Sequence, residues 1–64
     1  MENKIGIGSV VFFKHREYKN IKGQERIKLL NKLKNGEDLE EYQAINLYSN
    51  KEVTSDEVDW STWE

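Results

Sequence analysis

The single histidine of this 64-residue chain, His15, stands two residues before Glu17. An imidazole beside a carboxylate is a pairing that general-base catalysis uses. No serine or cysteine in a recognisable nucleophile motif accompanies it, and a chain of this size has little volume for a pocket that excludes water. The sequence therefore predicts a protein that is not an enzyme.

Metal and cofactor chemistry has equally little support. Asp56, Glu57 and Asp59 stand close together, but they lack the alternating acids, the glycine and the distant glutamate of a calcium loop. The chain has no cysteine, which excludes thiolate zinc sites, and one histidine cannot make a histidine-rich one. We therefore expect no metal and no cofactor, and a location in the reducing cytoplasm.

The closing stretch DEVDWSTWE sets both tryptophans of the chain among acids. Tryptophan and tyrosine are enriched at binding hot spots, and acids around them suit docking on a basic protein site, including one that normally holds DNA phosphates. The alternative is that the tryptophans fill the core of a small protein that has few apolar residues. The acids favour a divided role, in which Trp60 closes the sheet and Trp63 faces a partner. The predicted partner-binding residues are Trp60, Trp63, Tyr48, Asp56, Glu57, Asp59, Glu37, Glu40 and Glu41.

Basic residues gather in the first half of the chain. Residues 1–36 carry nine lysines and arginines against three acids, whereas residues 37–64 carry one lysine against nine acids. Such asymmetry indicates an interaction surface of one sign, or two halves that neutralise each other on folding. Nucleic-acid binding is the weaker alternative, because the net charge is −2 and no recognition-helix motif is present. That alternative would use Lys14, Arg16, Lys19, Lys22 and Arg26.

The length of the chain permits one domain, residues 1–64, with a small core. Such a domain buries only about 60% of its unfolded surface, and its core rarely supplies more than roughly 3–5 kcal/mol. Because no disulfide can stabilise so small a core, the sequence favours stabilisation by self-association or by a partner. A structural homodimer is therefore a further alternative. No apolar run approaches the ~20 residues of a membrane span, so no membrane partner is expected.

Four segments in an α+β fold are predicted to position these side chains. Residues 5–13 alternate as a strand that is apolar on both faces only from Val10 onward. The polar stretch after it fits a hairpin with a short return strand around residues 18–21, or a plain loop.

The clearest helix covers residues 24–35. Ile27, Leu30 and Leu33 recur at three-residue spacing, with Leu29 beside them, and form one apolar stripe. Gly36 is expected in the left-handed conformation that ends a helix.

Residues 38–48 favour a second helix, which would make a helical hairpin with the first. Asp38 and Glu41 have the spacing of a capping box, with Asp38 as N-cap. Beyond Gln43 the pattern fits strand alternation nearly as well. One helical turn followed by a strand is therefore the alternative.

The last segment, residues 56–63, is predicted as a strand or a short helix. Ser55 is a candidate N-cap for a helix that begins at Asp56, whereas VDWSTW alternates as a strand. A strand here would pair with the strand at residues 5–13 and close the fold. Otherwise that first strand would pair with its own copy across a two-fold axis.

These features favour a small protein-interaction module that binds in fixed stoichiometry. Many lysines, asparagines and isoleucines beside few alanines and no proline suggest an AT-rich genome. The type expected is therefore a small inhibitor or adaptor of a phage or mobile element. On this interpretation, removal of residues 58–64 abolishes partner binding while the fold survives.

Overall fold

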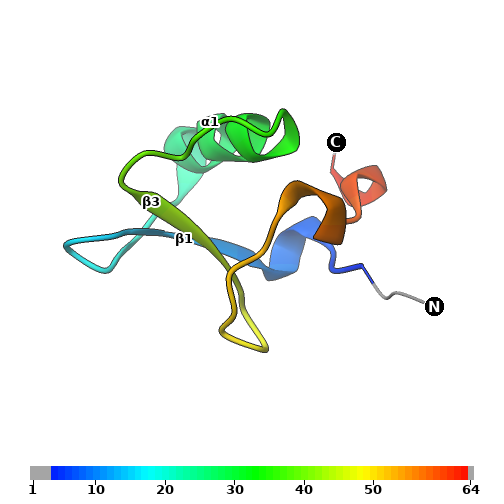
Figure 1. The fold of residues 1–64 in the computed structure, drawn as a ribbon, viewed down its shortest axis with the longest axis horizontal. Helices are drawn as coiled ribbons and strands as arrows, with labels where there is room; N and C mark the ends of the chain where they lie inside the picture. Colours follow the sequence, from blue (N-terminus) through cyan, green and yellow to red (C-terminus); the bar gives the residue numbers. More distant parts are fainter. Residues whose placement is uncertain (1–3, 64) are drawn as a thin grey trace.

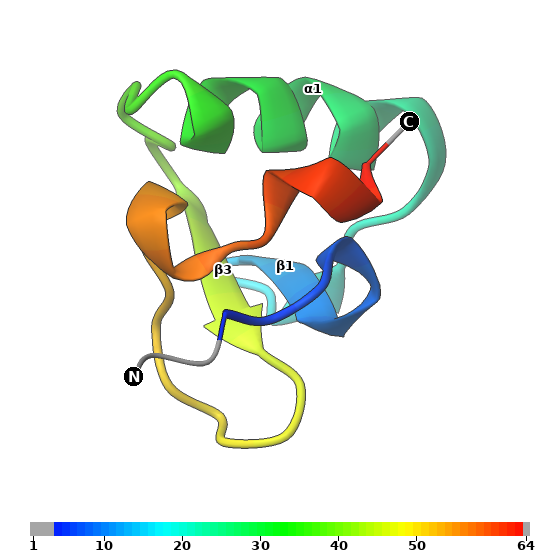
Figure 2. The ribbon, with the colours of Figure 1, turned by 90° about the vertical axis from the view of Figure 1, so that its right-hand side faces the viewer.

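Helix α1 (Gly23–Lys34) lies across one face of an antiparallel sheet in this computed structural model, which describes residues 4–63 (Figures 1 and 2). The sheet has the strand order β2-β1-β3, with β1 at Val10–Lys14, β2 at Lys19–Asn20 and β3 at Tyr42–Asn46. One helix and a three-stranded sheet form a small single domain. The predicted α+β class is confirmed.

Strand β1 begins later than the sequence predicts. Ile7–Ser9 form a short 3-10 helix, and Ile5 makes only an isolated parallel bridge, to Val58. The alternation predicted from Val10 onward is confirmed, because Val10 and Phe12 are 1% and 0% exposed. β1 is the central strand: β3 pairs with its whole length on one side, and on the other β2 pairs with Phe13 and Lys14 while Arg26 bonds the Val10 carbonyl, which disfavours the alternative pairing with its own copy.

The predicted hairpin is confirmed, with a shorter return strand than expected. β2 pairs with β1 so that Lys14 lies opposite Lys19. Tyr18 takes a left-handed φ of 52° in the connecting turn.

Helix α1 begins and ends one residue before the predicted positions. Leu29, Leu30 and Leu33 are buried, but Ile27 is 41% exposed and lies outside the buried stripe. Arg26 stands four residues before Leu30, on the side that faces the sheet. The prediction that Ile27 belongs to the buried stripe is therefore wrong, because Arg26 takes the sheet-facing position in the first turns of α1.

Gly36 ends the helix as predicted. It has a φ of 73°, and its N–H donates to the Leu33 carbonyl at 3.1 Å. The N–H of Glu37 donates to the Lys32 carbonyl at 2.8 Å, which completes a Schellman motif.

The predicted second helix at residues 38–48 is wrong. β3 occupies residues 42–46 of this segment and pairs with β1 along its whole length. The predicted capping box of Asp38 and Glu41 gives way to a tight turn, in which Asp38 Oδ1 accepts the Glu40 N–H at 3.0 Å. Glu40 has a φ of 60°, which no helix accommodates. The alternative of a turn followed by a strand is correct.

The last segment forms two 3-10 helices, Ser55–Glu57 and Trp60–Thr62, instead of a strand. The residue at the N-cap of the first is Thr54, and not Ser55 as predicted. The Thr54 N–H donates to Glu57 Oε1 at 3.0 Å. The prediction of a strand over residues 56–63 is therefore wrong, whereas the prediction of short helical structure is correct.

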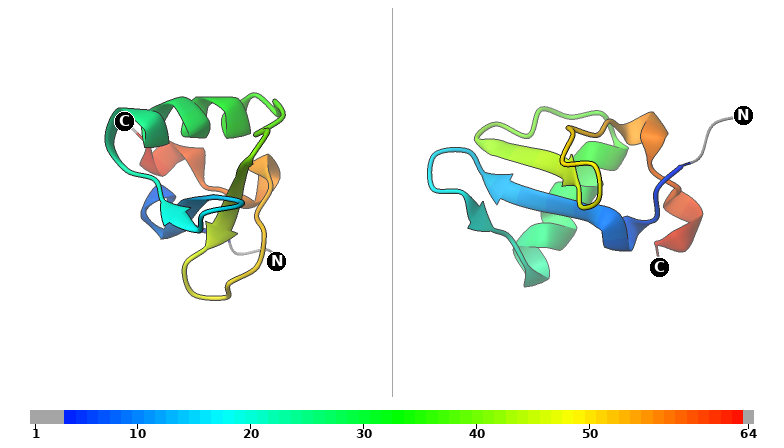
Figure 3. Two further views of the ribbon diagram at one scale, coloured as in Figure 1. Left: turned by 90° about the vertical axis from the view of Figure 1, so that its left-hand side faces the viewer. Right: turned by 90° about the horizontal axis from the view of Figure 1, so that it is seen from below.

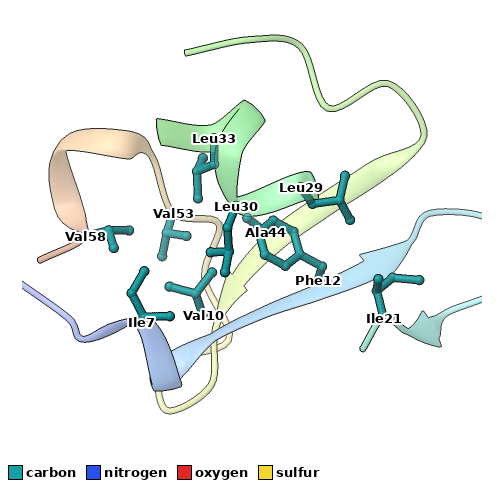
Figure 4. Packing of buried hydrophobic residues seen from close by; sticks show 10 residues of the cluster. All are labelled: Ile7, Val10, Phe12, Ile21, Leu29, Leu30, Leu33, Ala44, Val53 and Val58. Atoms are coloured by element: carbon teal, nitrogen blue, oxygen red, sulfur yellow. The ribbon is translucent and has the colours of Figure 1, made fainter. Parts of the chain in front are cut away.

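The end of the chain does close on its start, through Ile5. The Ile5 N–H donates to the Glu57 carbonyl at 3.0 Å, and its carbonyl accepts the Asp59 N–H at 2.7 Å. Val58, between these two, is 1% exposed. Val58 belongs to the hydrophobic core, which lies between α1, the sheet and the last segment (Figure 4). The buried residues of this core are Ile7, Val10, Phe12, Ile21, Leu29, Leu30, Leu33, Ala44, Val53 and Val58.

Candidate protein-interaction surface

Both tryptophans lie against the core. Trp60 and Trp63 are half-buried, and their ring centroids are 5.6 Å apart. The Trp60 Nε1–H donates to the Ser55 carbonyl at 2.8 Å, which satisfies the polar atom of the indole. The ammonium of Lys34 lies 5.5 Å from the Trp63 ring centroid, in cation–π geometry. This packing favours a core role for both rings, and each leaves only part of its surface for a partner.

Asp59 fastens the end of the chain. Its Oδ1 accepts the N–H of Ser61 at 3.2 Å and the Ser61 hydroxyl at 2.6 Å. These bonds hold the pKa of the Asp59 carboxyl below its ordinary value. The Asp59 carbonyl accepts the Thr62 hydroxyl at 2.7 Å, and that hydroxyl in turn accepts the Ile7 N–H at 3.0 Å. The carboxylate of Asp59 thus has partners inside the chain.

Asp56 and Glu57 line an open groove between the start of the chain and the segment after β3. The Thr54 hydroxyl donates to Asp56 Oδ1 at 2.6 Å and lowers the pKa of that carboxyl, and Lys4 acts in the same direction. Glu57 Oε1 is bonded by the Thr54 N–H, and the side chains of Asp56 and Glu57 are both exposed. The groove holds about 640 Å³ and is lined by Lys4, Ile5, Asn46, Val53, Thr54, Asp56 and Glu57.

Tyr48 is the predicted aromatic anchor that is most exposed. It is 82% exposed, in the turn after β3. Asn46, which lines the groove, accepts the Tyr48 N–H on its Oδ1 at 2.9 Å. This bond fixes the backbone of the turn relative to the groove.

The acids at residues 37–41 meet basic side chains of the first half of the chain. Glu40 forms an ion pair with Lys32 at 2.8 Å. The pKa of Lys32 is raised chiefly by its hydrogen bond to Glu40, and further by the charges of Glu37 and Asp38. The two halves of the chain therefore neutralise each other here. A shallower pocket on this side is lined by His15, Arg16, Glu40 and Glu41.

Arg26, assigned by the sequence to the nucleic-acid alternative, holds backbone carbonyls instead. Its Nη2 donates to the carbonyl oxygens of Ile7 and Val10, both at 2.8 Å. These bonds tie α1 to the 3-10 helix and to the start of β1. The signal for this role was its helical spacing from Leu30 and Leu33, which places an arginine on the apolar side.

The other four basic residues of that alternative lie around the hairpin and the start of α1. Lys14 and Lys19 face each other across the ladder of β1 and β2. Arg16 lies in the turn between these strands, and Lys22 directly precedes α1.

Replacement of Arg26 by methionine is expected to lower the free energy of unfolding by about 1.5–3 kcal/mol, the usual contribution of hydrogen bonds to a charged group. The substitution keeps a long side chain but removes the Arg26 donor from both carbonyls, and only that of Ile7 keeps another, the Val10 N–H. Urea denaturation measures the change. Lys28→Met is the matched control, because Lys28 is exposed on the same helix. Equal urea midpoints for the two variants would contradict this role.

No protein-family model, curated protein or solved structure matches this chain. Within residues 4–63, no helix has the length and apolar character to cross a bilayer. The same part of the chain contains no cluster of three side chains suited to hold a metal ion. The function is therefore inferred from the groove and from the faces of the fold.

Proposed function

We propose that this chain is a non-enzymatic protein-interaction module, which binds a basic segment of another protein in the groove of Asp56 and Glu57. The observation that carries the proposal is the state of these two carboxylates. Each has one oxygen bonded by Thr54, and both side chains are exposed in the wall of the groove, where a partner can reach their second oxygens. A lysine or arginine of the partner would supply charge-assisted hydrogen bonds to the second oxygens.

The surroundings of the groove support the same kind of partner. Ile5 and Val53 provide apolar wall, along which the aliphatic stem of a lysine or arginine packs well. Tyr48 adds an exposed aromatic ring on the adjacent turn, a residue type enriched at hot spots. Trp60 helps to hold the segment that carries the acids of the groove, because its indole N–H bonds the carbonyl of Ser55, directly before Asp56.

The proposal includes the type of protein that the composition suggests. A small chain that binds in fixed stoichiometry acts as an inhibitor or adaptor, and its composition fits a phage or mobile element. The absence of cysteine supports a cytoplasmic location.

Affinity capture from the source cell with the tagged chain, followed by mass spectrometry, tests this function. Asp56→Asn combined with Glu57→Gln removes both charges but keeps the acceptor oxygens for Thr54. We expect recovery of the partner to fall at least about tenfold, because the ion pairs to its basic segment are lost. Glu17→Gln removes an exposed acid that neither lines the groove nor belongs to the predicted binding residues, and should leave recovery unchanged.

A second pair of variants tests the aromatic part of the surface. Tyr48→Ser is expected to weaken capture of the same partner, whereas Tyr18→Ser, at an equally exposed position in the hairpin, is not. Undiminished recovery with both the groove variant and Tyr48→Ser would overturn the assignment of the binding surface.

A further inference from the structure

The face of the sheet that turns away from α1 is not covered by a helix in residues 4–63. Figure 3 (right) shows β1 and β3 from this side, with α1 behind them. Val11, Phe13 and Ile45 alternate with buried residues of the same strands, so their side chains point to this side. All three are half-buried. The open face is defined by Val11, Phe13, Gln43 and Ile45.

Glu52 forms one end of a row across the open face. Ile45 lies opposite Val11 of β1 on one side and opposite Glu52, in an isolated antiparallel bridge, on the other. Residues directly opposite each other in an antiparallel pair share a face of the sheet. Val53, the next residue, is 7% exposed and belongs to the core side. The exposed side chain of Glu52 therefore lies at the rim of the open face.

Lys22 forms the other end of the same row. The Ile21 N–H donates to the Phe12 carbonyl at 3.0 Å, which extends the antiparallel register by one pair beyond β2. Ile21 is 4% exposed, on the core side with Phe12. Lys22 has an extended backbone, with φ −136° and ψ 171°. Alternation therefore directs the exposed Lys22 to the open face, beside Val11.

We infer that the open face binds a second copy of this chain in a two-fold dimer. The row runs Lys22, Val11, Ile45, Glu52 across four neighbouring stretches of backbone. The two-fold axis of this dimer lies above the open face, midway between β1 and β3 and parallel to the strands. Because neighbouring strands are about 4.8 Å apart, Lys22 lies about 7 Å to one side of this axis and Glu52 about 7 Å to the other. Rotation about this axis brings Lys22 of each copy over Glu52 of the other. It also brings Val11 over Ile45, as an isologous interface requires.

The dimensions of the open face set the strength of this dimer. Four stretches of backbone about 4.8 Å apart span about 19 Å, and the five residues of β1 or β3 span about 17 Å, whereas the two outer stretches are shorter. This area is at most about 320 Å² per copy, which is less than the roughly 800 Å² per partner of a standard specific interface, so we expect a weak, transient dimer with a dissociation constant of about 100 μM to 1 mM. The inference goes beyond the proposed function, because it uses no residue of the groove and needs no other protein.

Sedimentation velocity of the purified chain from about 10 μM to about 1 mM tests the dimer. Lys22→Glu and Glu52→Lys should each weaken dimerisation at least about tenfold at low salt, because each turns two attractive contacts into repulsive ones. The double variant Lys22→Glu/Glu52→Lys exchanges the charges and should restore the dimer. An equimolar mixture of the two single variants should form heterodimers, since both contacts are then between opposite charges.

The control is Lys28→Glu, which makes the same charge change at an exposed position on α1, across the sheet from the open face. It should dimerise like the unaltered chain. Circular dichroism verifies that every variant is folded. An unaltered chain that stays monomeric at about 1 mM, or single variants that dimerise as well as it does, would overturn the inference.

Discussion

A chain that lacks residues 58–64 is expected to be unfolded, with no helical circular-dichroism signal and no cooperative urea transition. The deletion removes Val58, which is 1% exposed, and both tryptophans, which pack on the core. It also removes Asp59, whose N–H bonds the Ile5 carbonyl. This outcome reverses the sequence-based expectation that the fold survives the deletion.

The magnitude follows from the small size of the core. Burial of one valine side chain contributes about 1.5–3 kcal/mol, and each tryptophan buries more area than a valine. The sum exceeds the roughly 3–5 kcal/mol that a core of this size supplies. No stable fold is therefore expected to remain after the deletion.

A matched pair of substitutions isolates the contribution of burial from that of chain length. Val58→Asp places an unpaired carboxylate in the core and should unfold the protein. Val11→Asp makes the same change on the open face, where water reaches the carboxylate, and should leave it folded. A cooperative transition in the deleted chain or in Val58→Asp would show that the last segment is not part of the core.

The end of the chain shows a limit of sequence analysis, because charge alone does not show that Asp56 and Asp59 each have one carboxylate oxygen bonded by a residue two positions away. Thr54 bonds Asp56, and Ser61 bonds Asp59, so both carboxylates have partners within one turn. A count of charges therefore does not separate Asp59, which holds the last 3-10 helix, from Asp56, which lines the groove. A hydroxyl residue two positions from an acid is the local signal for such a turn.

The segment at residues 38–48 shows a different limit of prediction. A helix stop such as Gly36 depends on the local conformation of one residue, and it was predicted correctly. Asp38 and Glu41 have a spacing that suits a capping box, although the chain here makes a tight turn. β3 is stabilised by pairing with β1, about thirty residues earlier in the chain, and this contact outweighs local propensity. The groove could not be predicted either, since it joins Lys4 to residues 53–57.

Phe12→Ala is expected to lower the free energy of unfolding by about 3–5 kcal/mol, as for other buried phenylalanines. Phe12 is 0% exposed and lies between the sheet and α1 (Figure 4). The loss equals the whole contribution of a core of this size, roughly 3–5 kcal/mol. Urea denaturation should therefore find most of this variant unfolded even without denaturant.

Phe13→Ala is the matched control, because it deletes the same side chain one position later, on the open face. Phe13 is half-buried and its loss leaves no closed cavity, so the urea midpoint should fall much less than for Phe12→Ala. The same substitution removes an apolar contact of the proposed dimer and should weaken its self-association. A Phe13→Ala variant that loses as much stability as Phe12→Ala would show that the sheet is covered on both faces within one chain, and that no face remains for a second copy.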